Sequence, residues 1–72
     1  MLISLVILPG RGQEDVTVRD GSTVADLIES RGLTGYQVMV DGATVASNAL
    51  RSVVFRPGGV REVVAVRDVK GA

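Results

Sequence analysis

The sequence predicts a small α+β fold, with one helix packed across one face of a mixed sheet of four to five strands. Residues 1–8 and 60–66 are rich in Ile, Leu and Val on both alternating sides, which is typical of central strands. Between them, residues 24–31 place apolar side chains at helical spacing. A hairpin, one helix and further strands in this order favour a two-layer α+β architecture.

The length limits the chain to one domain. A chain of 72 residues has room for a single hydrophobic core. Hydrophobic residues make up 46% of it, which excludes an intrinsically disordered segment. We therefore expect one domain over residues 1–72, with a short C-terminal tail at 68–72.

The composition excludes several kinds of site. Because the chain has no cysteine and no histidine, it cannot form disulfides, Cys/His zinc sites or histidine general bases. Eight basic residues balance eight acidic ones, and Tyr36 and Phe55 are the only aromatic residues. Nucleic-acid binding is therefore disfavoured relative to protein binding. We expect no catalytic residue, no cofactor and no metal ion, and a protein that is not an enzyme.

The first strand is the apolar run 1–8, which Pro9 and Gly10 end. The run is far shorter than the roughly 20 residues that span a bilayer, and it lacks the basic start and the cleavage site of a signal peptide. We expect no membrane contact, and a location in the cytoplasm, or within a virus particle if the protein is a structural subunit. Alternation at 16–19 predicts a second strand, which forms a hairpin with the first.

The helix has sequence signals at both ends. Thr23 is suited to the N-cap, and Asp26, three residues on, completes a capping box. Gly32 predicts a left-handed C-cap after residues 24–31. About nine helical residues are not stable alone, so the helix must pack on the sheet.

The second half of the chain returns to strands. Residues 36–40 and 43–45 predict a hairpin, because Asp41 and Gly42 form a strong two-residue turn signal. A short helical turn is expected around Leu50.

The last elements complete the predicted sheet. Residues 53–55 predict a short extended piece, and 60–66 the last long strand. Since residues 1–8 and 60–66 are apolar on both sides, we expect them to lie side by side and parallel at the centre of the sheet.

Three segments resemble the ubiquitin-like sulfur carriers of the ThiS/MoaD family. Residues 21–28 are similar to the start of the carriers' helix, 38–42 to their central hairpin, and 64–72 to their last strand and tail. The resemblance covers nearly the whole chain and implies a ubiquitin-like β-grasp fold. It is weakly specific for function, because this fold hosts many roles.

The C-terminal tail departs from the family pattern. The carriers end in two glycines, and the resemblance implies that an adenylating enzyme activates the terminal carboxylate with ATP before it becomes a thiocarboxylate. This chain instead ends in Lys70, Gly71 and Ala72. Two of these positions carry a side chain where the family has a bare backbone, so we expect no thiocarboxylate to form.

One sheet face is expected to be apolar and exposed. In the first strand Met1, Ile3, Leu5 and Ile7 are expected to face the helix, which leaves Leu2, Ser4, Val6 and Leu8 outward. In the last strand both alternating sets contain valine, so the outward set stays open. The predicted protein-interaction residues are Leu2, Val6, Leu8, Val63, Val64 and Val66. Depending on register, Arg19, Arg61 and Arg67 border this face.

These features predict a non-catalytic ubiquitin-like module that binds protein or builds structure through the exposed apolar face. The expected partner is another protein or copies of the same chain, in an assembly such as a viral particle. The alternative function is a sulfur carrier or protein modifier that an adenylating enzyme activates at its C-terminal carboxylate. A third alternative, ranked below these two, is an RNA-associated β-grasp module.

Overall fold

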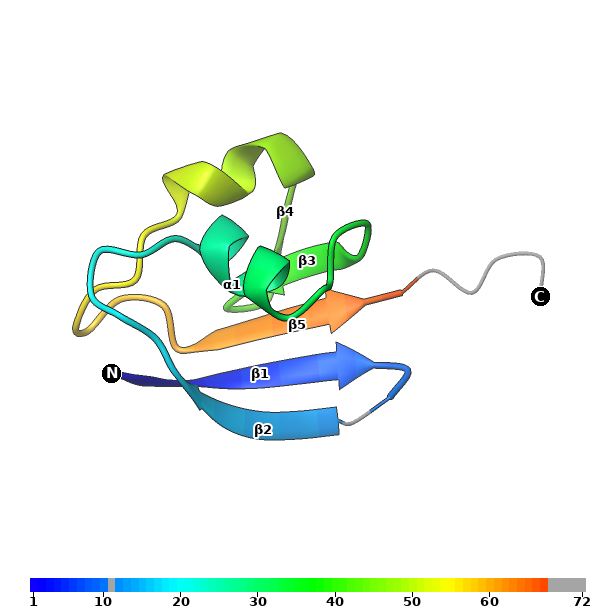
Figure 1. Ribbon diagram of the computed structural model, residues 1–72, viewed down its shortest axis with the longest axis horizontal. Coiled ribbons are helices and arrows are strands. Elements are labelled where there is room, and N and C mark those ends of the chain that lie inside the picture. Colours follow the sequence, from blue (N-terminus) through cyan, green and yellow to red (C-terminus); the bar gives the residue numbers. More distant parts are fainter. Residues whose placement is uncertain (11, 68–72) are drawn as a thin grey trace.

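The computed structural model describes residues 1–10 and 12–67, which form a mixed five-stranded sheet with one α-helix (Figure 1). The predicted α+β class and the single helix are therefore confirmed. Across the sheet the strand order is β2-β1-β5-β3-β4. Along the chain the elements are β1 (Leu2–Leu8), β2 (Gly12–Thr17), α1 (Val24–Ser30), β3 (Gln37–Val40), β4 (Ala43–Val45), the 3-10 helix η1 (Ser47–Ser52) and β5 (Glu62–Val66).

Strands β1 and β5 lie side by side and parallel at the centre of the sheet, as their apolar sequences predict. Leu5 pairs with Val63 and Ile7 with Ala65. Leu5, Val63 and Ala65 are fully buried, because they face the helix. β2 and β3 are antiparallel to the central strands that they flank.

The second strand begins earlier than its sequence predicts. It runs over Gly12–Thr17, whereas apolar alternation is visible only from Val16. The polar residues before Val16 belong to the sheet because β2 is an edge strand, where charged side chains are tolerated and discourage further pairing. Residues 53–55 contribute only a single bridge, from Val54 to Thr23.

Helix α1 has the predicted caps at both ends. Thr23 Oγ1 accepts a hydrogen bond from the Asp26 amide at 3.2 Å, and the Thr23 amide donates to Asp26 Oδ2 at 3.0 Å. At the other end the Leu33 amide donates to the Ile28 carbonyl at 2.9 Å, and Gly32 has a φ of +68°. This is a Schellman motif, in which the residue after the cap is left-handed.

The β3–β4 hairpin is fastened to the central strand β5. Its two-residue turn has positive φ at both positions, +49° at Asp41 and +88° at Gly42, as a type I′ turn requires. Asp41 Oδ1 accepts hydrogen bonds from the amides of Arg61 at 3.1 Å and Glu62 at 3.0 Å. The Asp41 amide in turn donates to the Glu62 carbonyl at 3.0 Å. One side chain therefore forms the turn and holds the start of β5.

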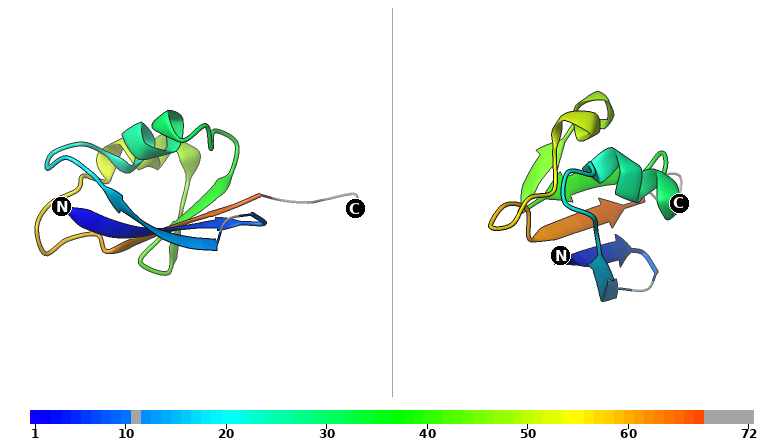
Figure 2. Two further views of the ribbon diagram at one scale, coloured as in Figure 1. Left: turned by 60° about the horizontal axis from the view of Figure 1, so that its bottom comes forward. Right: turned by 60° about the vertical axis from the view of Figure 1, so that its left-hand side comes forward.

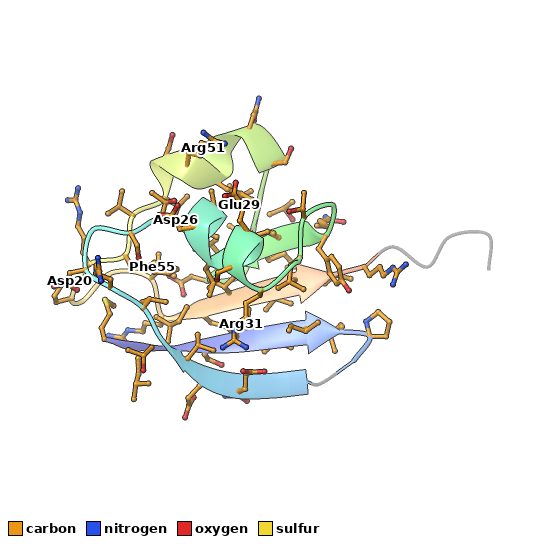
Figure 3. The ribbon with its side chains drawn as sticks, viewed as in Figure 1. Asp20, Asp26, Glu29, Arg31, Arg51 and Phe55 are labelled. Atoms are coloured by element: carbon orange, nitrogen blue, oxygen red, sulfur yellow. The ribbon has the colours of Figure 1, made fainter. Side chains whose placement is uncertain are left out.

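The core lies between α1 and the sheet, and among the described residues it contains no buried polar or charged side chain. Phe55 is its largest fully buried member (Figure 3). The Phe55 amide donates to the Ser22 carbonyl at 2.8 Å, and the Gly21 amide donates to the Phe55 carbonyl at 2.9 Å. These bonds join the segment after η1 to the segment before α1. The buried side chains are Ile3, Leu5, Val16, Val18, Val24, Ala25, Leu27, Ile28, Leu33, Val38, Leu50, Phe55, Val63 and Ala65.

Candidate functional site

One face of the sheet is covered and the other is open. Helix α1 and η1 lie on the same side of the sheet, and no described element covers the opposite side (Figure 2). In β1 the alternation is clear, since Ile3 and Leu5 are buried whereas Leu2 is 68% and Leu8 44% exposed. We call the uncovered side the open face.

The strands present six apolar side chains on the open face. None of the six belongs to the buried core or to the partly buried side chains that pack against it. They come from three neighbouring strands, β1, β5 and β3. The six residues are Leu2, Val6, Leu8, Met39, Val64 and Val66.

The strand register joins these side chains into rows. Val6 pairs with Val64, and Val64 pairs with Met39, so the three form one row across three strands. We call it the apolar row. Leu8 and Val66 are register partners in the adjacent row. Neighbouring strands are about 4.8 Å apart, so the side chains of a row lie in mutual reach.

The structure settles which valines of β5 point outward. Val64 and Val66 are half-buried and outside the core, whereas Val63 is 0% exposed. The prediction of Val63 as an interaction residue is wrong, because its register partner Leu5 faces the helix and places Val63 on the same side. Met39 was missed as a member of this surface. The burial of Val38 in the same strand implies an outward Met39, so alternation within β3 is the signal that finds it.

The open face carries acidic rather than basic residues beside the apolar row. Ser4 pairs with Asp15 on one side and with Glu62 on the other, which forms a row that we call the acidic row. Of the arginines expected at its border, Arg61 and Arg67 lie just outside the two ends of β5. Arg19 lies beyond the end of β2.

The Ser4 hydroxyl is at the centre of the acidic row. Its Oγ is enclosed and has no hydrogen-bond partner among the described residues. Buried hydroxyls are nearly always satisfied by a partner, so this oxygen is exceptional. It adds a neutral oxygen between Asp15 and Glu62.

A hollow lies on the helix side of the sheet, opposite the open face. It has a volume of about 560 Å³ and lies between α1, η1 and the paired strands β3 and β4. Buried Ile28, Val38 and Leu50 contribute apolar surface to it. Glu29 and Arg51 lie at its edge, with Arg51 Nη2 and Glu29 Oε2 3.8 Å apart (Figure 3). Both side chains are well exposed, so this ion pair contributes little to stability.

The described residues contain no group of three acidic residues arranged to hold a metal ion. In the same part of the chain, no helix has the length and hydropathy needed to cross a membrane. The predicted tail residues Lys70, Gly71 and Ala72 lie outside the described residues.

Comparisons with protein-family models, with curated proteins and with solved structures gave no match. No relative therefore assigns a role to the open face.

Proposed function

We propose that the chain is a ubiquitin-like β-grasp domain that acts without catalysis, by binding another protein through the open face. The observation that carries the proposal is the apolar row of Val6, Val64 and Met39, which no described element covers. The strand order and the parallel pairing of β1 with β5 support the β-grasp assignment. The proposal includes a cytoplasmic location, or a place within a virus particle if the domain is a structural subunit.

The apolar row lies outside the core of the domain. Leu5 and Val63 already supply the core with one apolar side from each central strand. Val6 and Val64 lie on the other side and contribute nothing to that core. Burial of apolar surface contributes about 25 cal/mol per Å². A partner that covers the row buries its remaining exposed apolar surface, and this burial contributes to the free energy of binding.

The size of the domain sets the extent of the contact. A stable interface covers about 800 Å² on each partner. The whole domain exposes 4633 Å². A partner of ordinary footprint therefore occupies most of one sheet face and reaches from the row of Leu8 and Val66 to the acidic row.

A partner of different sequence fits this face better than a second copy. In a symmetric face-to-face pair, the acidic row opposes either itself or the row of Leu8 and Val66. The first arrangement places like charges together, and the second removes carboxylates from water without a cation. Among the described residues, no strand contributes lysine or arginine to the open face.

Charge insertion into the apolar row tests the proposal. Val6→Glu and Val64→Glu place a carboxylate on the open face, and Ser52→Glu is the matched control, because Ser52 is exposed at the end of η1 on the helix side. Proteins captured by the wild-type domain from its host are identified by mass spectrometry. The purified partner is then titrated against each variant by calorimetry.

The expected result is that both open-face variants weaken binding by about thirtyfold or more while Ser52→Glu has no effect, since a buried unpaired charge at the centre of an interface is among the costliest changes. Equal affinity for all three variants would overturn the proposal. Sedimentation of the wild-type domain alone tests whether a second copy of the chain occupies the open face. A dimer that Val64→Glu dissociates would replace the foreign partner with a second copy.

The second candidate function is a sulfur carrier or modifier activated at its C-terminal carboxylate. The resemblance of residues 21–28 and 38–42 to the ThiS/MoaD carriers favours it. Incubation with a cognate adenylating enzyme, ATP and a sulfur donor, followed by intact mass measurement, tests it. We expect no mass change, because the chain ends in Lys70, Gly71 and Ala72 rather than in two glycines. The increase that accompanies exchange of one oxygen for sulfur would support the carrier function.

A further inference from the structure

The chemistry of the open face defines the kind of partner that it fits. We infer that the occupant is a basic amphipathic helix, which covers the apolar row with its apolar side chains and places a lysine or arginine over the acidic row. This inference rests on the proposed function, since it concerns the same surface. It adds the charge and the secondary structure of the segment that binds.

Charge complementarity argues for the cation. Asp15 and Glu62 flank Ser4 on neighbouring strands, on the same face as the apolar row. Neither carboxylate has an arginine or lysine partner from a strand on that face. A footprint that covers the apolar row also covers these carboxylates, and removal from water is unfavourable unless a cation pairs with them.

The acceptors of the acidic row are suited to one basic side chain. Asp15 and Glu62 lie two strands apart, about 10 Å between their backbones, and Ser4 lies on the strand between them. A lysine ammonium has three donors and an arginine has five. The two carboxylates are the acceptors open to such a side chain, because the Ser4 Oγ between them is enclosed.

The spacing of the rows accommodates a helix. The acidic row and the apolar row are two residues apart along the strands, as are the apolar row and the row of Leu8 and Val66. Each step is about 6.8 Å, because a strand rises about 3.4 Å per residue. Residues i and i+4 of a helix are about 6 Å apart along its axis and share one face. A helix that lies along β1 and β5 therefore meets the rows in turn.

Two synthetic peptides of 18 residues test the inference. Both have leucine at positions i+4 and i+8 of one helical face in a background of alanine and glutamine. One carries lysine at position i and the other carries glutamate. Binding is followed by the amide chemical shifts of the wild-type domain, of the Asp15→Asn and Glu62→Gln double variant, and of Val64→Glu.

The lysine peptide is expected to shift the amides of Val6, Val64 and Met39 and to bind the wild-type domain about fivefold more tightly than the glutamate peptide, the size of an exposed ion pair. The double variant should abolish this preference while keeping its circular dichroism spectrum. Val64→Glu should weaken both peptides.

The outcomes separate this inference from the proposed function. If both peptides bind the open face of the wild-type domain with equal affinity, the cation preference is wrong and the binding surface stands. If neither peptide binds, or if the shifts cluster at the hollow between α1 and η1, both the inference and the proposed surface are contradicted.

Discussion

Val6 of β1 and Val64 of β5 are register partners that point away from the helix, and the residues before them, Leu5 and Val63, are register partners buried beneath it. The same pair of parallel strands therefore serves the core with one side and the solvent with the other. Neighbouring residues of either strand therefore lie on opposite faces, one in the core and the next on the open face.

The pair Val63 and Val64 offers the first test of this division. We expect Val64→Glu to change the free energy of unfolding by no more than about 1 kcal/mol, since the half-buried Val64 side chain lies outside the core. Val63→Glu should leave the domain unfolded, because a charge in the core has no partner. Urea denaturation followed by circular dichroism measures both. Unfolding of Val64→Glu would show that the sheet faces are assigned incorrectly.

Asp41 links the hairpin turn to β5, and replacing its side chain should lower the stability of the domain. Asp41→Ala leaves the amides of Arg61 and Glu62 without their acceptor and should lower the free energy of unfolding by about 1–2 kcal/mol. Asp41→Asn is the control, because it keeps an acceptor oxygen and tolerates positive φ. The two variants are compared by thermal denaturation. Equal stability of both would mean that Asp41 Oδ1 contributes nothing.

The capping box of α1 gives a third prediction. Thr23→Ala removes the acceptor for the Asp26 amide and should lower the free energy of unfolding by about 1 kcal/mol. Thr23→Ser keeps the hydroxyl and should be nearly neutral. Chemical denaturation of the two variants in parallel measures these changes. If Thr23→Ser lost as much stability as Thr23→Ala, the effect would come from the lost methyl group and not from the hydroxyl.

Phe55 is expected to dominate the core. Phe55→Ala should lower the free energy of unfolding by about 3–5 kcal/mol. A domain of this size has only about 3–5 kcal/mol in total, so the variant should be largely unfolded at room temperature. Phe55→Leu, which keeps most of the volume, should remain folded. A cooperative transition of ordinary midpoint in Phe55→Ala would contradict the central place of this ring.

Local signals in the sequence predicted the parts of the fold that a few adjacent residues determine. Thr23 with Asp26, and Asp41 with Gly42, specify a helix start and a turn without reference to the rest of the chain. The start of β2 was not predictable, because an edge strand pairs through its backbone whatever its polar side chains. The outward side of β5 was not predictable either. Valine occupies both alternating sets, and only the pairing with Leu5 places Val63 inside.

The acidic row could not be predicted from the sequence either. Asp15, Ser4 and Glu62 are far apart in sequence, and two different strand pairings bring them into one line. The expectation of arginines around the face depended on a register that the sequence left open. Once β1 and β5 are paired, the register places Glu62 beside Ser4 on the open face.

The central claim is that the open face binds a partner protein. Its most direct test is methyl cross-saturation by nuclear magnetic resonance, in the complex of the labelled wild-type domain with its unlabelled purified partner. Irradiation of the partner should attenuate the methyl signals of Val6, Met39 and Val64 most strongly and leave those of Ile28 and Leu50 unaffected. Strongest attenuation at Ile28 and Leu50, beside the hollow between α1 and η1, would contradict the claim.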